Sequence, residues 1–128
     1  MKKFLAMLLL CSMLLSTTAF ATMEAYYGEY TLSAGARATT EAYVKSQSIN
    51  VMKVWPVTQT SGVTVWYRGR QQDASHSATV AESYTSMPPN IQLTYLDGCG
   101  YVGNSYRLRV QNDSESSKDL TAQGTWRP

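Results

Sequence analysis

One stretch of the sequence places a cysteine where a reactive thiol could stand. In Asp97-Gly98-Cys99-Gly100-Tyr101 the thiol lies between two glycines, as it would in an open turn. A nucleophilic cysteine needs a neighbouring base or cation that keeps it in the thiolate form. The chain contains a single histidine, His76. The sequence therefore offers one imidazole and several arginines as candidates for that base or cation.

The segment from Leu93-Thr94 through Cys99 to Arg107-Leu108 resembles the nucleophile strand and the following arginine strand of sortase-like transpeptidases. That resemblance implies a small exported β-barrel enzyme with Cys99 as its nucleophile. The family's Thr-x-x-Thr-Cys sequence is absent, because Asp97-Gly98 precedes the cysteine here. His76 also lies closer to the cysteine than the family's histidine does. A motif indicates a function only where its context is met, so we expect no catalytic residue and no enzyme.

The simpler interpretation of Cys99 is a small thiol in a glycine turn between two strands. The other cysteine, Cys11, lies in the segment that we expect to be removed on export, which excludes a disulfide within one mature chain. If Cys99 is packed under its loop, it is a structural residue. If it is exposed, it could link two chains in a covalent dimer.

Metal and cofactor chemistry have little support in the sequence. His76 and Cys99 are 23 positions apart, with no second histidine and no paired cysteines beside them. Such a set does not match the four-ligand composition of a structural zinc site. No glycine loop of the phosphate-binding kind is present. We therefore expect neither a metal nor a cofactor.

Two segments with alternating residues carry the best candidates for binding. In 63–70, valines and a tyrosine alternate with polar residues, and in 105–111 apolar residues alternate with arginines. This pattern predicts strands with one face on a core and the other in water. If the two strands share a sheet, one surface carries the candidate binding residues Trp66, Arg68, Arg70, Arg107 and Arg109.

Arginines with a nearby tryptophan suit an acidic ligand. Guanidinium groups pair bidentately with carboxylates and phosphates, and an indole ring stacks on sugars or cations. The surface would therefore fit an anionic cell-wall polymer, an acidic glycan or another envelope component. The alternative is an ordinary solvated sheet face with no ligand. We assign the other two tryptophans, Trp55 and Trp126, to the core.

The elements that position these residues are predicted to be short strands. Thr, Val, Ile, Tyr and Trp are abundant, turn residues recur at strand-like intervals, and no helical stripe is visible. Thr60-Ser61-Gly62 reads as a hairpin turn. The pattern predicts an all-β fold, a small antiparallel β-sandwich of seven to eight strands. We expect strands near 26–33, 39–46, 49–58, 63–70, 76–84, 90–96, 104–111 and 119–127.

The N-terminus has the features of a secretory signal peptide. Lys2-Lys3 precedes an apolar run that ends in Ala19-Phe20-Ala21, and the run is too short to span a membrane. We expect a signal peptide at 1–21, a single domain at 22–128 and a secreted or wall-associated protein. Without the two lysines, 9 basic residues face 9 acidic ones. A neutral mature chain is not expected to bind nucleic acid.

Two short resemblances bear on function. The ending "YRLRVQNDSESSKDLTAQGTWRP" resembles the close of small secreted β-rich proteins of Gram-positive bacteria, whose function is unknown. The run "HSATV", His76 to Val80, is similar to a stretch of lactococcin-type bacteriocins. We expect a secreted, non-enzymatic module that acts by surface recognition at the bacterial envelope or extracellularly. The alternative is a bacteriocin-like antagonist of other bacteria, and a more distant one is a sortase-like cysteine transpeptidase that uses Cys99.

Overall fold

The computed structural model describes residues 24–128, and within that range the chain is all β. The predicted signal peptide lies outside the described residues. Nine strands form where β-branched and aromatic residues alternate with polar ones, and no helix is present between residues 24 and 128. The strands are β1 (Ala25–Leu32), β2 (Arg37–Thr39), β3 (Tyr43–Val44), β4 (Val51–Gln59), β5 (Val65–Gln71), β6 (Glu82–Tyr84), β7 (Ile91–Thr94), β8 (Ser105–Asn112) and β9 (Leu120–Arg127).

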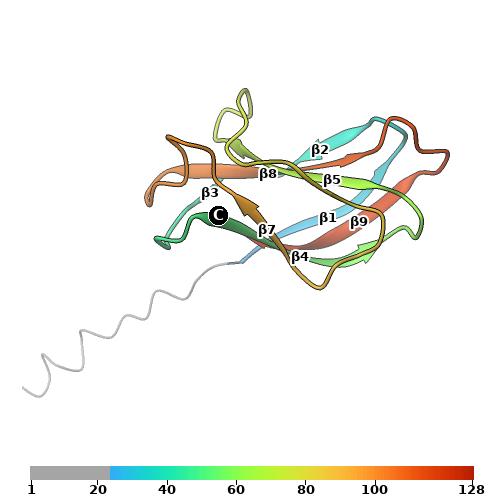
Figure 1. Ribbon diagram of the computed structural model, residues 1–128, viewed down its shortest axis with the longest axis horizontal. Coiled ribbons are helices and arrows are strands. Elements are labelled where there is room, and N and C mark those ends of the chain that lie inside the picture. Colours follow the sequence, from blue (N-terminus) through green and yellow to red (C-terminus); the bar gives the residue numbers. More distant parts are fainter. Residues whose placement is uncertain (1–23) are drawn as a thin grey trace, which may run out of the picture.

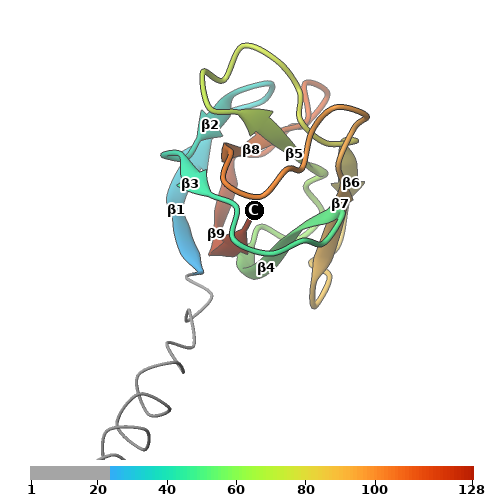
Figure 2. The ribbon, with the colours of Figure 1, turned by 90° about the vertical axis from the view of Figure 1, so that its left-hand side faces the viewer.

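The strands pack as two antiparallel sheets, which confirms the sandwich-like fold (Figure 1). One sheet has the order β1-β9-β4-β7. The other has the order β2-β8-β5-β6, with β3 pairing to β8 beside β2. Seen end-on, the two sheets enclose a single interior (Figure 2). Within the described chain, only the β2–β3 and β5–β6 connections stay inside one sheet.

This crossing between sheets overturns the predicted hairpin at Thr60-Ser61-Gly62. The turn is present, but it joins β4 of one sheet to β5 of the other. Both edges of β4 are already occupied, because β9 pairs on one side and β7 on the other. After the turn, Val63 and Val65 point into the interior, where both are buried.

Two of the expected strands are shorter than predicted. The expected strand 39–46 is split into β2 and β3, because Thr40 leaves the ladder and uses its side-chain Oγ1 to accept a hydrogen bond from the Leu108 N–H at 3.0 Å. The expected strand 76–84 is reduced to β6 and isolated bridges from Ser77 to Arg70 and from Thr79 to Tyr95. The segment 72–81 is therefore a loop that contacts β5 of the five-stranded sheet and the end of β7 in the other sheet.

The core lies between the sheets and contains the inward-facing half of each alternating strand. Val65, Tyr67, Leu108 and Val110 come from the five-stranded sheet, and all four are fully buried. Trp126 of β9 is buried as predicted, with Tyr43 packed edge-on against its ring at 5.7 Å. Burying a large apolar side chain contributes about 1.5–3 kcal/mol, so this interior is the main source of stability.

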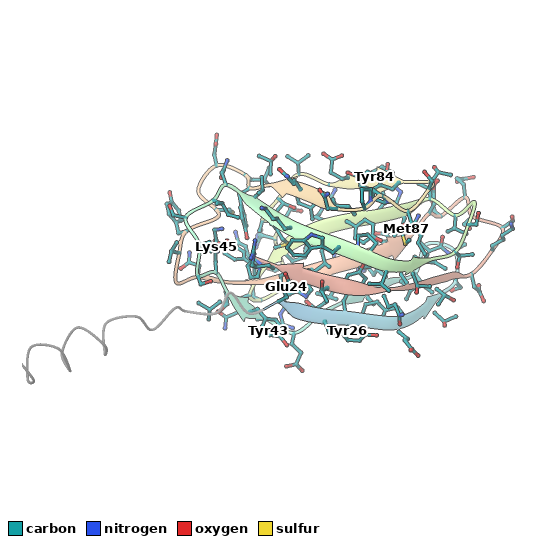
Figure 3. All side chains as sticks on the ribbon, turned by 90° about the horizontal axis from the view of Figure 1, so that it is seen from below. Glu24, Tyr26, Tyr43, Lys45, Tyr84 and Met87 are labelled. Atoms are coloured by element: carbon teal, nitrogen blue, oxygen red, sulfur yellow. The ribbon has the colours of Figure 1, made fainter. Side chains whose placement is uncertain are left out.

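One charged side chain is buried near the end of the sandwich. Lys45 (labelled in Figure 3) is completely covered. Its Nζ lies 4.9 Å from the centre of the Tyr95 ring. Within residues 24–128 this ammonium group has no hydrogen-bond partner. Burial lowers the pKa of Lys45, and the nearby charge of Arg127 lowers it further.

Candidate functional site

Pairing of β5 with β8 brings the predicted site residues into one sheet. In the register of this pair Arg68 lies opposite Arg109, Arg70 opposite Arg107, and Trp66 opposite Gln111. Their neighbours along the strands point inward and are buried, so these side chains lie on the outer face. All five predicted binding residues therefore start from the same face of one sheet.

Two of the arginines are engaged by the protein itself. Arg70 is 8% exposed, and its guanidinium donates to the Ala74 and Ser75 carbonyls at 2.8 Å and to the Ser77 Oγ at 2.9 Å. Arg107 donates to the Gln72 carbonyl at 2.6 Å and to the Thr40 carbonyl at 2.9 Å. These side chains hold the 72–77 loop and the β2–β3 connection against the sheet.

Arg70 is charged despite its burial. Its burial lowers the pKa of the guanidinium, as do the neighbouring charges of Arg68 and Arg37. An arginine nevertheless stays protonated because its ordinary pKa is above 12. The backbone carbonyls around Arg70 thus replace the water that its charge has lost.

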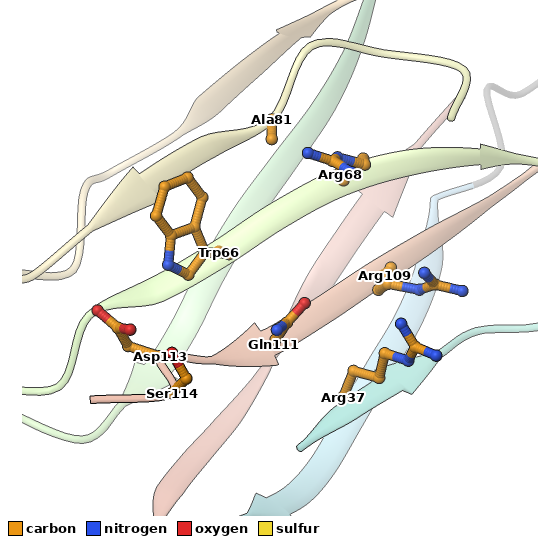
Figure 4. A pocket seen from close by; sticks show the side chains of 8 residues that line it. All are labelled: Arg37, Trp66, Arg68, Ala81, Arg109, Gln111, Asp113 and Ser114. Atoms are coloured by element: carbon orange, nitrogen blue, oxygen red, sulfur yellow. The ribbon is translucent and has the colours of Figure 1, made fainter. Parts of the chain in front are cut away.

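The remaining residues line a groove on the outer face of the five-stranded sheet. The groove has a volume of about 320 Å³ and lies between β2, β8, β5 and the loops beside them. Arg37 of β2 completes it, since Arg37 pairs with Gln111 of β8. The groove is lined by Arg37, Trp66, Arg68, Ala81, Arg109, Gln111, Asp113 and Ser114 (Figure 4).

Arg37 was missed by the sequence analysis, which began the corresponding strand at residue 39. A weak signal was available, because Arg37 and Thr39 flank the small Ala38 in an alternating pattern. The pairing that places Arg37 beside Arg109 is long-range, however. No local pattern shows that β2 lies next to β8.

The groove is strongly cationic at one end. Within residues 24–128, no carboxylate lies within 4.0 Å of the guanidinium nitrogens of Arg37, Arg68 or Arg109. Arg109 donates to the Thr39 Oγ1 at 3.2 Å, and Arg68 donates weakly to the Ser77 Oγ at 3.4 Å. Burial and the charges of neighbouring arginines lower the pKa of Arg109. These arginines repel one another, and an anion bound between them would reduce that repulsion.

The other end of the groove is aromatic. Trp66 is 40% exposed and lies beside Asp113, while Arg37 and Arg109 stand at the far end (Figure 4). The Asp113 carboxylate accepts a hydrogen bond from the Glu115 N–H at 3.2 Å, which fixes its orientation. A ligand that spans the groove would therefore meet a flat ring and one carboxylate at one end, and guanidinium groups at the other.

Cys99 lies on the connection between β7 and β8, half-buried against the core. Its Sγ accepts a hydrogen bond from the Gln71 Nε2 at 3.7 Å, and its N–H donates to the Leu96 carbonyl. His76 is exposed in the 72–81 loop with its Nδ1 2.6 Å from the Ser75 Oγ. No hydrogen bond joins Cys99 to His76 among the described residues.

The His76–Val80 run, which is similar to a bacteriocin stretch, contains two buried residues. Ala78 and Thr79 are almost completely covered. The Thr79 Oγ1 accepts a hydrogen bond from the Gly69 N–H at 2.8 Å, which fastens the loop to β5. Packing therefore accounts for two of the five residue types in this run, Ala78 and Thr79.

Trp55 corrects one expectation, because it is not in the core. It lies on the outer face of the four-stranded sheet, on the same side of β4 as Lys53. The Arg127 guanidinium lies 5.4 Å from the centre of its ring. Trp126, by contrast, fills the interior.

Between residues 24 and 128, no three His, Cys, Asp or Glu side chains gather closely enough to hold a metal ion. In the part of the chain that the structure describes, no helix has the length and hydropathy needed to cross a bilayer. Comparison with known proteins found no family model, no curated protein and no solved structure that matches this chain.

Proposed function

We propose that the mature chain is a secreted, non-enzymatic recognition module that binds an anionic polymer of the bacterial envelope. The observation that carries this proposal is the groove in which Arg37, Arg68 and Arg109 meet without a carboxylate partner among the described residues. Exposed guanidinium groups pair bidentately with phosphate or carboxylate oxygens. A site of this kind would bind by charge and shape and needs no catalytic group.

The two ends of the groove indicate what repeating unit would fit. An indole ring offers a flat apolar surface for a sugar ring, and the neighbouring Asp113 carboxylate accepts hydrogen bonds from hydroxyl groups. The arginines at the other end would hold the acidic group. The proposed ligand is therefore a glycan or polyol chain whose units carry a phosphate or a carboxylate.

The proposal is tested by equilibrium binding of residues 22–128 to two soluble polyanions, polyphosphate and polygalacturonate. Trp66 fluorescence reports the occupied groove, and a Trp66→Phe variant identifies its contribution. We expect Arg68→Gln/Arg109→Gln to weaken binding roughly tenfold or more, since each charge-assisted hydrogen bond contributes about 1.5–3 kcal/mol.

The matched control is Lys53→Gln, which removes a charge from the opposite sheet and should leave binding unchanged. Equal affinity of the wild type and the double arginine variant for both polymers would refute the groove as the site. Stronger binding of one polymer would distinguish a phosphate ligand from a carboxylate ligand.

A further inference from the structure

The outer face of the four-stranded sheet carries two aromatic residues, one exposed and one half-buried. Tyr26 of β1 is 58% exposed, and Trp55 of β4 is half-buried on the same face. This face is on the opposite side of the sandwich from the arginine groove. Figure 3 looks onto it, and Tyr26 lies along the β1 edge of a sheet surface that no loop of residues 24–128 crosses.

The register of the sheet sets the distance between the backbone positions of Tyr26 and Trp55. Tyr26 pairs with Thr125 of β9, and Thr125 pairs on its other side with Trp55. The three residues therefore form one row across neighbouring strands. Two strand spacings separate the backbone positions of the aromatic residues by about 10 Å. This is roughly the length of a disaccharide unit in an extended glycan.

Polar side chains that can form hydrogen bonds lie between and beside the two rings. The Tyr26 hydroxyl donates to the Gln123 Oε1 at 3.1 Å, and the Thr125 Oγ1 lies 3.5 Å from the Glu24 Oε2. The Arg127 guanidinium lies over the Trp55 ring and restricts the position of the indole. Its N–H groups are donors beside that ring. Hydroxyl, amide and guanidinium groups can all pair with sugar hydroxyls.

This pattern differs from that of a protein-binding face. A protein interface has a continuous apolar centre surrounded by polar residues. Here the exposed apolar groups are separate, because Thr125 lies between the two rings and Val57 is the other exposed apolar side chain of β4. A sugar chain presents the matching pattern, because each ring has an apolar C–H face and hydroxyl groups at its edge.

We infer that this face binds a neutral glycan chain, with one sugar ring on Tyr26 and another on Trp55. The Tyr26–Thr125–Trp55 row carries the inference, which does not depend on the arginine groove. The protein would then have two binding faces of different chemistry on its two sheets.

The test uses affinity electrophoresis of residues 22–128 through gels that contain hydroxyethylcellulose, arabinoxylan or galactomannan. We expect retardation in at least one polymer. Tyr26→Leu keeps an apolar side chain without a flat ring and should weaken that interaction roughly tenfold, whereas Tyr26→Trp should preserve it. Trp55→Leu should act like Tyr26→Leu, and circular dichroism checks that each variant is folded.

Two controls separate this inference from the proposed function. Arg68→Gln/Arg109→Gln should leave retardation unchanged, and so should Tyr101→Ala, which removes an exposed ring elsewhere on the surface. Absence of retardation in all three polymers, or equal retardation of Tyr26→Leu, would overturn the inference. A concentration-dependent dimer that Tyr26→Leu abolishes would assign the face to a second copy of the chain and would also overturn it.

Discussion

At the scale of single residues, burial decides whether an arginine holds the fold together or is open to a ligand. Arg68 and Arg70 stand two positions apart on the same strand and face. Arg70 is enclosed by the 72–77 loop and donates to its carbonyls, while Arg68 is exposed beside the groove. The alternation in the sequence indicated the shared face but could not show the loop that folds over half of it.

This difference gives a paired prediction for stability. Arg70→Lys removes the planar donor set, so the Ala74 and Ser75 carbonyls lose partners in a covered position. We expect it to lower the free energy of unfolding by about 1–3 kcal/mol. Arg68→Lys should change it by less than about 0.5 kcal/mol, as surface substitutions usually do. Urea denaturation measures both, and equal stability of the two variants would show that Arg70 does not anchor the loop.

The buried Lys45 leads to a prediction about pH. Its pKa is lowered in the folded chain, mainly by burial, from an ordinary value of 10.5. Between the lowered value and 10.5 the unfolded chain binds more protons, so this lysine reduces stability at neutral pH and reduces it less as the pH rises. Lys45→Met should therefore stabilise the protein by about 1 kcal/mol at pH 7, even though the contact with Tyr95 is lost.

The stabilisation by Lys45→Met should shrink as the pH approaches 10. Thermal denaturation of both proteins at several pH values measures the difference, in which the effects of the tyrosines cancel. A difference that is independent of pH would contradict the lowered pKa.

At the scale of elements, the tail Gly124-Thr125-Trp126-Arg127-Pro128 acquires a structural explanation. A Cβ atom on Gly124 would lie 2.3 Å from the Trp55 carbonyl oxygen and 2.8 Å from the Tyr27 ring. Glycine is therefore required where β9 packs between β4 and the Tyr27 side chain. Trp126 and Pro128 are buried beyond it.

Gly124→Ala is expected to destabilise the fold by at least about 1–3 kcal/mol, because backbone and a buried ring must both move. The control is Thr121→Ala, on the exposed side of the same strand, which should change stability by less than about 0.5 kcal/mol. Chemical denaturation compares the two. A Gly124→Ala protein as stable as Thr121→Ala would mean that the close approach is not needed.

The elements also show how much the sequence can predict. The strands with clean alternation, 63–70 and 105–111, were correctly placed, because alternation is a local pattern. The Thr60-Ser61-Gly62 turn was placed correctly but given the wrong partners. Turn residues specify that the chain reverses, and they do not specify which sheet the next strand joins. Trp55 was assigned to the core on residue type alone, but it shares the outer face of β4 with Lys53.

At the scale of the whole molecule, the residues that the structure describes are near neutral in sum but concentrate arginines in one groove. The arginine groove lies on one sheet and the Tyr26–Trp55 face on the other. Net charge therefore underestimates how strongly one face can attract an anion, because attraction at short range depends on local groups. Under the proposed function, the two faces would bind two chemically different parts of one envelope.

The most direct test of the central claim is retention of residues 22–128 on purified Gram-positive cell walls. The walls are used before and after acid extraction of their anionic polymers. We predict that the wild type is retained on intact walls at low salt, and that both acid extraction and the variant Arg37→Gln/Arg68→Gln/Arg109→Gln abolish most of this retention. Retention of the triple variant equal to that of the wild type on intact walls would contradict the account.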